Sequence, residues 1–187
     1  MQEKAGRLYP VEKAGTLQSR LRRVIQNPKK ILSGYIKEGM VVLDVGCGPG
    51  YFTIETAKMV GDYGKVIAAD IQQGMLDKLK SSIRENEISK RISFHKCEED
   101  KIGITENVDL VLAFYIVHEV PNQKAFFEEI KTILKCGGIL FLVEPNFIVS
   151  KEAFGQTVNI AKEIGFIPID KPRILLSNAI VLKNEIN

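Results

Sequence analysis

The chain has 187 residues, of which 45% are apolar and 26% are charged, close to an average globular protein. This length buries enough surface for a single domain and excludes a small scaffold that depends on disulfides or a metal. The 26 basic and 23 acidic residues give a net charge of +3. That charge is too mild to indicate nucleic acid or an anionic membrane as the main partner.

Cysteine and histidine usage argues against stabilising cross-links. Cys47, Cys97 and Cys136 lie far apart in the sequence, and their odd number favours free thiols in a reducing compartment. With two histidines and no CxxC motif, no metal site is expected. The sequence has no run of 18 apolar residues, and its N-terminus lacks the apolar stretch of a secretory signal. We therefore expect a soluble cytoplasmic protein without membrane insertion.

The first 38 residues are expected to form an arm and two helices that cap an acceptor site. Residues 1–15 are polar and rich in breaking residues, which indicates an arm, and the apolar spacing of residues 17–25 predicts a helix. A second helix is predicted to begin at Pro28, with Asn27 as its N-cap, and to end at Gly39. Its predicted apolar face consists of Ile31, Leu32, Tyr35 and Ile36.

Residues 39–187 alternate between strand and helix patterns, and we expect them to form the core of a single domain. Buried strands are predicted at 41–45, 65–69, 108–114 and 139–143, an edge strand at 91–97, and two final strands at 166–173 and 178–183. Helices are predicted at 51–60, at 72–86, from Pro121 to Gly137-Gly138, and from Ser150 to Gly165. This alternation predicts an α/β fold, a doubly wound and mostly parallel sheet with helices on both faces. Such sheets bind ligands beyond the carboxyl ends of their strands, where the strand order reverses.

The sharpest motif is the glycine-rich turn between the first core strand and the helix after it, Gly46-Cys47-Gly48-Pro49-Gly50. Glycines permit a tight turn and let a ligand approach the backbone. A dinucleotide site needs G-x-G-x-x-G, but position 51 is Tyr51. Pro49 removes an N–H donor, and no basic residue is present for a phosphate.

Three carboxylates follow or end the strands around this turn. Asp70 ends the second strand and can accept hydrogen bonds from both ribose hydroxyls of a nucleoside. Glu98 can accept a hydrogen bond from an exocyclic amine such as that of adenine, and Asp44 lies where an ammonium group would be held. A ligand with a ribose, an amine and positive charge fits S-adenosylmethionine better than NAD.

These segments resemble the motifs of class I S-adenosylmethionine-dependent methyltransferases. VVLDVGCGPGYFT resembles their first motif, AADIQQGML their second, and ISFHKCEED their third. DLVLAFYIVHEV and FEEIKTILKCGGILFLVEP resemble their strand-four and strand-five segments. The similarity runs from about residue 30 to 184, and it is nearest to the group related to ubiquinone and menaquinone biosynthesis (methyltransferase type 11).

The resemblance implies a seven-stranded sheet that ends in an antiparallel hairpin. It implies that residues 46–50 hold the methionine part of the cofactor, that Asp70 binds the ribose, and that residues 97–98 flank the adenine. The expected cofactor-binding set is Asp44, Gly46, Cys47, Gly48, Gly50, Asp70, Ile71, Cys97, Glu98 and Ala113. The chain departs from the family in having Cys97-Glu98 where Gly-Asp is usual, and Lys135-Cys136 where Lys-Pro is frequent.

Methyl transfer from a sulfonium needs alignment and exclusion of water, and a base only when the acceptor must lose a proton. His118 is the candidate base because it follows the fourth core strand, although a histidine that only shapes the pocket fits the same position. We expect a small-molecule acceptor and no nucleic acid. Two alternatives stay open: a non-catalytic module that binds S-adenosylmethionine, and a nucleotide-dependent oxidoreductase.

Overall fold

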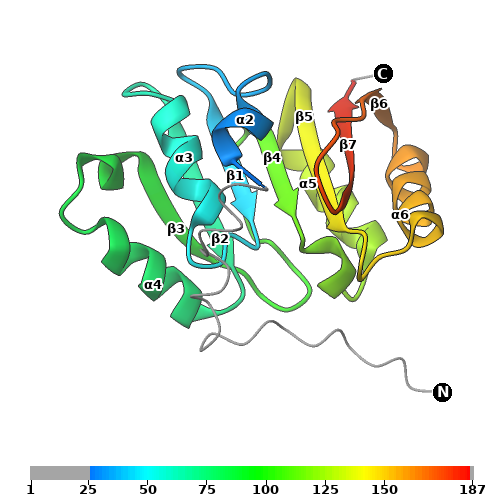
Figure 1. Cartoon of the computed structure of the whole chain (residues 1–187), viewed down its shortest axis with the longest axis horizontal. Helices are drawn as coiled ribbons and strands as arrows, with labels where there is room; N and C mark the ends of the chain where they lie inside the picture. Colours follow the sequence, from blue (N-terminus) through cyan, green and yellow to red (C-terminus); the bar gives the residue numbers. More distant parts are fainter. Residues whose placement is uncertain (1–25, 186–187) are drawn as a thin grey trace.

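The computed structural model describes residues 26–185, which form a seven-stranded sheet covered by helices on both faces (Figure 1). The strand order is β3-β2-β1-β4-β5-β7-β6. The strands are β1 (Val41–Val45), β2 (Lys65–Asp70), β3 (Ile92–Lys96), β4 (Val108–Phe114), β5 (Leu134–Pro145), β6 (Phe166–Asp170) and β7 (Ser177–Asn184). The α-helices are α2 (Pro28–Leu32), α3 (Tyr51–Met59), α4 (Gln73–Ile83), α5 (Gln123–Ile133) and α6 (Lys151–Glu163). Short 3-10 helices lie at Glu87–Arg91 (η2) and Val117–Glu119 (η3).

The sheet has the predicted topology. β1 to β5 pair in parallel, and β7 runs antiparallel to both β5 and β6. The strand order reverses at β1, which pairs with β2 on one side and β4 on the other. β3 forms one edge of the sheet and is only half-buried, as its alternating sequence predicts. The predicted fold class is therefore confirmed.

Two apolar layers, one on each face of the sheet, hold the helices in place. One layer joins the sheet to α5 and α6 and includes the fully buried Phe127 and Ile130. The other joins it to α2, α3 and α4 and includes the fully buried Leu32 and Leu79. Because the central strands are covered on both faces, their sequences are nearly unbroken apolar runs, with Asp44 in β1 and Asp109 in β4 as exceptions.

Local signals predicted most helix ends correctly. The Asn27 side chain accepts a hydrogen bond from the backbone N–H of Lys30, and Pro28 is the first residue of α2. The Ser150 side chain accepts one from the N–H of Ala153 at the start of α6. The predicted arm, the helix over 17–25 and the first part of the predicted cap lie outside the described residues.

Three predicted helix ends were wrong, and one of them is the end of the helix predicted over 72–86, which lies at Ile83. The helix that begins at Pro28 ends at Leu32 rather than Gly39, because the poor helix formers Ser33 and Gly34 lead into a turn. Tyr35 and Ile36 lie beyond this helix, yet both N–H groups bond to the carbonyl of Leu32. Tyr35 packs edge-on against Phe141 of β5, with ring centroids 4.9 Å apart.

The helix predicted to reach Gly137-Gly138 ends at Ile133, and β5 begins at Leu134. Leu134 adopts an extended conformation and pairs with Val108 of β4, ahead of an irregularity in the strand register. Its carbonyl oxygen accepts a hydrogen bond of 2.8 Å from the side-chain amide of Asn184 on β7. Pairing with β4 and this contact from β7 stabilise strand geometry that local sequence does not indicate.

Candidate functional site

A cavity of about 1150 Å³ lies at the carboxyl ends of the parallel strands. The loops that follow β1, β2, β3, β4 and β5 all contribute to its walls, as the doubly wound topology predicts. Among the described residues, the cavity has two halves. One half is formed by the glycine loop and the segments after β2 and β3, and the other by η3, the loop after β5, and the facing sides of α5 and α6.

The glycine loop bends in a way that only glycine adopts readily. Gly46, Gly48 and Gly50 have φ angles of +70°, +54° and +89°. A Cβ atom on Gly46 would lie 2.7 Å from Cγ1 of Ile116, which is too close for a side chain. The N–H groups of Gly46 and Cys47 donate to the carbonyl of Ala69 at 2.8 and 3.0 Å, so the end of β2 holds the loop.

Replacement of Gly50 tests this geometry. A Cβ at this position would lie 2.2 Å from Cδ1 of Leu79, a fully buried residue of α4. We expect Gly50→Ala to lower the free energy of unfolding by about 3 kcal/mol, from the left-handed backbone and the overpacking together. Gly155→Ala is the matched control, because nothing lies within 4 Å of that position in α6. Urea denaturation of both variants measures the difference, and equal stabilities would contradict it.

Asp70 joins the glycine loop to the end of β2. Its Oδ2 accepts a hydrogen bond from the N–H of Gly48, and its Oδ1 accepts one from the N–H of Gln72, both at 2.8 Å. The side chain is buried in the cavity wall. Burial raises the pKa of Asp70, and the two backbone donors partly oppose that rise. Each carboxylate oxygen keeps a further lone pair for a ligand hydroxyl.

Other predicted cofactor residues surround this half of the cavity. Asp44 is buried, and its Oδ2 accepts a hydrogen bond of 2.6 Å from the hydroxyl of Thr53. Ile71 and the exposed Glu98 also contribute to the wall. Burial raises the pKa of the Cys97 thiol to about 12, and it also raises the pKa of the Cys47 thiol well above its ordinary value. Both thiols therefore stay protonated at neutral pH.

Two predicted cofactor residues do not line the cavity. Ala113 is fully buried within β4, between β1 and β5. Gly50 lies at the N-terminus of α3 and packs against Leu79. Gly50 therefore shapes the loop, and Phe114 is the residue of this part of β4 that faces the cavity.

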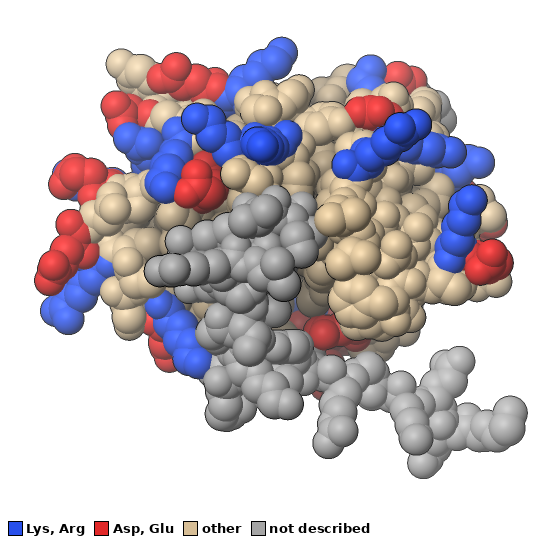
Figure 2. All heavy atoms as spheres, viewed as in Figure 1, with Lys and Arg blue, Asp and Glu red and all other residues tan. Residues whose placement is uncertain are grey.

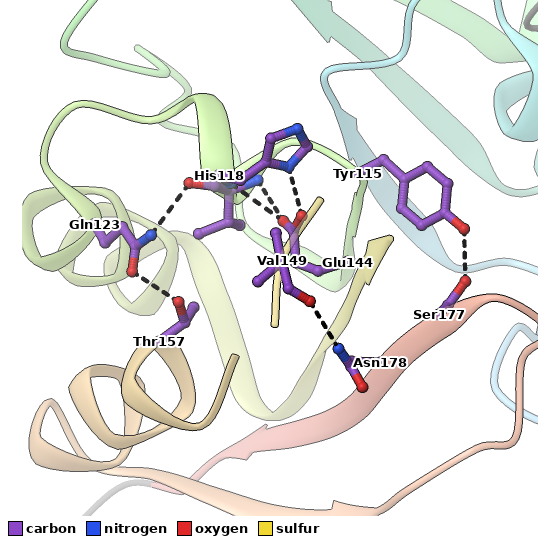
Figure 3. Close-up of polar contacts among 9 residues, drawn as sticks. Tyr115, His118, Gln123, Glu144, Val149, Thr157, Ser177 and Asn178 are labelled. Atoms are coloured by element: carbon purple, nitrogen blue, oxygen red, sulfur yellow. Dashed lines mark hydrogen bonds and ion pairs between the residues drawn. The ribbon is translucent and has the colours of Figure 1, made fainter. Parts of the chain in front are cut away.

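The second half of the cavity contains a histidine held by a buried carboxylate (Figure 3). His118 lies on η3, and its Nδ1 is 2.5 Å from Oε2 of Glu144. The other oxygen, Oε1, accepts hydrogen bonds from the N–H of Val117 at 2.7 Å and of His118 at 3.3 Å. Glu144 lies near the end of β5 with 1% of its surface exposed. The carboxylate thus fixes both the backbone and the ring of His118.

This contact determines the chemistry of the imidazole. An ionised carboxylate only accepts hydrogen bonds, so the ring proton lies on Nδ1 and Nε2 keeps its lone pair. Figure 3 shows the other ring nitrogen pointing away from Glu144. Burial alone would lower the pKa of His118, but its hydrogen bond and charge interaction with Glu144, with a further contribution from Glu119, raise it overall. A neutral His118 can take up a proton at Nε2.

Glu144 was not among the site residues predicted from the sequence. It is 26 residues from His118, and the two meet because β4 and β5 pair in register, with Phe114 opposite Val143. A glutamate within an otherwise buried apolar strand is a signal that a polar partner must be present. The sequence did not indicate which partner.

An aromatic residue that follows β4, Tyr115, also lines the cavity. Tyr115 has a φ of +65°, which is unusual for a bulky side chain. Its hydroxyl lies 2.6 Å from that of Ser177 on β7 and also contacts the side-chain amide of Gln26. The carbonyl of Gln26 accepts a hydrogen bond of 3.0 Å from Tyr51 on α3. Three segments far apart in the sequence therefore meet at Tyr115.

Hydrogen bonds between side chains and backbone fix the far wall of the cavity (Figure 3). The Gln123 amide donates to the carbonyl of Val117 at 3.3 Å and accepts from the hydroxyl of Thr157 at 3.0 Å, linking η3, α5 and α6. The Asn178 side chain donates to the carbonyl of Val149 at 3.2 Å. Gln123 therefore holds the histidine segment, and Asn178 holds the loop after β5.

The charge of the cavity distinguishes between cofactors. Among the described residues, eight carboxylates line it, against a single lysine, Lys101. Such a wall favours a sulfonium and an ammonium group and disfavours a pyrophosphate. The tight glycine loop and the Asp70 carboxylate also fit S-adenosylmethionine, and this fit does not depend on the overall charge of the cavity. No group of three or more residues in the described range 26–185 is arranged to hold a metal ion.

Comparison with known proteins decides the family. Residues 36–168 match a family model described as "Methyltransferase domain". The chain belongs to the methyltransferase family. The predicted membership of the class I S-adenosylmethionine-dependent methyltransferases is confirmed, and so is the predicted cofactor. The similarity to the group related to ubiquinone and menaquinone biosynthesis comes from individual relatives.

Individual relatives share the core of the chain. It is 33% identical over 110 residues to a demethylmenaquinone methyltransferase of Lactobacillus johnsonii, covering 58% of this chain and 45% of that protein. It is 28% identical over 109 residues to the ubiquinone/menaquinone biosynthesis C-methyltransferase UbiE of Shewanella frigidimarina, covering 58% and 43%. The chain thus spans less than half the length of these curated relatives. A crystal structure of an S-adenosylmethionine-dependent methyltransferase from Aquifex aeolicus is 26% identical, with a TM-score of 0.85 over 95% of this chain and 100% of that one.

Proposed function

We propose that the chain transfers a methyl group from S-adenosylmethionine to a small-molecule acceptor that loses a proton in the reaction. The observation that carries this proposal is the single cavity that contains the glycine loop with Asp70 on one side and the His118–Glu144 pair on the other. The names of the quinone-biosynthesis relatives support a small-molecule acceptor.

The cofactor half is assigned to binding and orientation. Asp70 would accept hydrogen bonds from the ribose, and Asp44 would attract the ammonium group. The glycine loop and its backbone N–H groups would lie along the methionine part. Cys97 and Glu98 would flank the adenine. When bound, S-adenosylmethionine supplies a methyl group already activated by its sulfonium charge.

The acceptor half is assigned to proton removal and exclusion of water. His118 would take the acceptor proton at Nε2, while Glu144 keeps the Nδ1 tautomer and stabilises the imidazolium that forms. Around it, Ile116, Phe147, Ile148 and Leu176 give the wall an apolar character suited to an acceptor with a large apolar part.

We further propose that residues 1–38 cap this site and that residues 39–187 form its core within one domain. Gln26 supports this, because it is buried in the cavity wall and forms hydrogen bonds with Tyr51 and Tyr115. The cytoplasm remains the predicted location, supported by the free cysteines.

Calorimetric titration with S-adenosylmethionine, S-adenosylhomocysteine and NAD tests the cofactor assignment. We expect binding of the first two at micromolar concentrations and none of NAD, because the acidic cavity opposes a pyrophosphate. Transfer of a labelled methyl group to acceptors in a cell extract then distinguishes an enzyme from a non-catalytic binding module. Binding of NAD alone would contradict the proposal, and cofactor binding without a labelled product under any condition would favour the module.

A further inference from the structure

The exposed apolar side chains of the described residues are concentrated in one part of the chain. Seven large apolar residues are exposed, and all except Tyr63 lie between residues 147 and 176. Phe147 and Ile148 follow β5 with 69% and 60% of their surfaces exposed, and Leu175 and Leu176 lie between β6 and β7 with 61% and 50%. We call these four residues the apolar patch.

The two loops that carry the apolar patch are joined. The N–H of Asn146 donates to the carbonyl of Leu176 at 3.0 Å, so the loops present their side chains together. Figure 2 shows a broad surface without charged side chains on the right of the view, bordered above by basic ones. Phe147, Ile148 and Leu176 also line the large cavity, so the patch lies at its opening.

A second cavity of about 640 Å³ adjoins the apolar patch at Leu175. It is lined by the basic side chains of Lys30 on α2 and Arg173 on the β6–β7 loop, and we call it the basic cavity. Neither side chain has an ion-pair partner among residues 26–185. Asp170, the one acid in its wall, accepts hydrogen bonds from the Tyr35 hydroxyl and the N–H of Lys171.

Apolar side chains beside two unpaired cations match the chemistry of one class of partner. An anionic phospholipid carries a phosphate for the cations and acyl chains for the apolar side chains. A globular protein partner would need an acidic side chain placed to enter this cavity, whereas an anionic bilayer presents many phosphates directly beside its acyl chains. The net charge of the whole chain is mild and does not reveal this arrangement, because the arrangement depends on where the two cations lie.

We propose that the apolar patch and the basic cavity form a docking surface for an anionic lipid bilayer. The phosphate of a lipid headgroup would lie between Lys30 and Arg173, and Phe147, Ile148, Leu175 and Leu176 would insert among the acyl chains. Docking in this orientation brings the opening of the large cavity to the membrane. Peripheral attachment of this kind needs no membrane-spanning helix, and none of the described helices is long and apolar enough to be one.

Flotation of the full chain with vesicles tests the proposal without any catalytic readout. The probes are vesicles of phosphatidylcholine alone and of phosphatidylcholine with phosphatidylglycerol. We expect binding to the second kind only, and weaker binding at high salt. Lys30→Gln with Arg173→Gln should reduce binding about 30-fold, since each basic residue near an anionic surface contributes about 1 kcal/mol. Phe147→Ser with Leu175→Ser should reduce it by at least about 20-fold.

The control variants remove basic and apolar side chains that lie outside the apolar patch and the basic cavity. Lys80→Gln with Arg84→Gln neutralises one lysine and one arginine that are exposed on and just after α4, and Tyr63→Ser removes an exposed apolar residue outside the patch. These variants should bind vesicles as the wild type does. Three results would overturn the proposal: no binding of anionic vesicles, equal losses in patch and control variants, or self-association that the patch substitutions abolish, which would assign the surface to a second copy of the chain.

Discussion

Asp70→Ala is expected to weaken binding of S-adenosylmethionine by at least about 100-fold. The substitution removes the carboxylate proposed to accept two ribose hydroxyls, and hydrogen bonds to a charged group contribute about 1.5–3 kcal/mol each. A loss of about 1.4 kcal/mol corresponds to a factor of ten in affinity. It also leaves the N–H groups of Gly48 and Gln72 without their acceptor, so the glycine loop loses its attachment to the end of β2.

Calorimetry on the variant measures this loss, and circular dichroism shows whether the fold is intact. Asp70→Asn separates charge from geometry, because its amide oxygen can still accept one backbone hydrogen bond. Asp77→Ala on the exposed face of α4 is the control, and it should bind as the wild type does. Unchanged affinity in Asp70→Ala would remove this residue from the cofactor site while leaving the family assignment intact.

His118→Ala is expected to lower kcat by about 10²- to 10⁴-fold, the usual contribution of a positioned general base. Glu144→Gln should cause a loss of similar order for a different reason. The glutamine amide would donate a proton to Nδ1 and force the ring proton onto Nε2, so that the base has the wrong tautomer. Cofactor binding should change little in either variant, because both residues lie in the other half of the cavity.

The pH profile distinguishes this role from a structural one. The base acts only when neutral, and its pKa is raised, so kcat/KM in the wild type should increase with pH through a value above the ordinary histidine range. Glu144→Gln removes the negative charge that raises the pKa, which should move this limb to lower pH. Glu163→Gln, an exposed change on α6, is the control. An unchanged profile in Glu144→Gln would contradict a base at His118.

The raised pKa of His118 has opposite effects on the pH dependence of activity and of stability. A histidine whose pKa is higher in the folded protein stabilises the fold when protonated, so this contribution is fully present below the unfolded-state pKa. It is lost as the pH rises through the folded-state value. His118 therefore favours stability at acidic pH and activity at higher pH.

The sequence predicted those parts of the site that depend on local patterns. Buried β-branched runs located the central strands, and the glycine loop with Asp70 at the end of the next strand indicated the cofactor. These features are contained within short segments, because a parallel strand, a tight turn and a helix start each have their own composition.

The parts that were missed depend on contacts between distant segments. Glu144 meets His118 only through the register of β4 and β5, and Gln26 contacts Tyr115 across a sequence separation of 89 residues. The premature end of α5 at Ile133 has the same origin, since pairing with β4 stabilises a strand there. No local pattern encodes such register.

The division of the cavity has an evolutionary consequence. Cofactor contacts are assigned to segments after β1, β2 and β3, whereas Tyr115 is anchored by Ser177 of the C-terminal hairpin and by Gln26. Under the proposed function, we therefore expect substitutions in the hairpin to reorient Tyr115 and change the acceptor side of the cavity, without altering a residue assigned to the cofactor. Descendants of one ancestral chain can in this way acquire new acceptors while the same cofactor is retained.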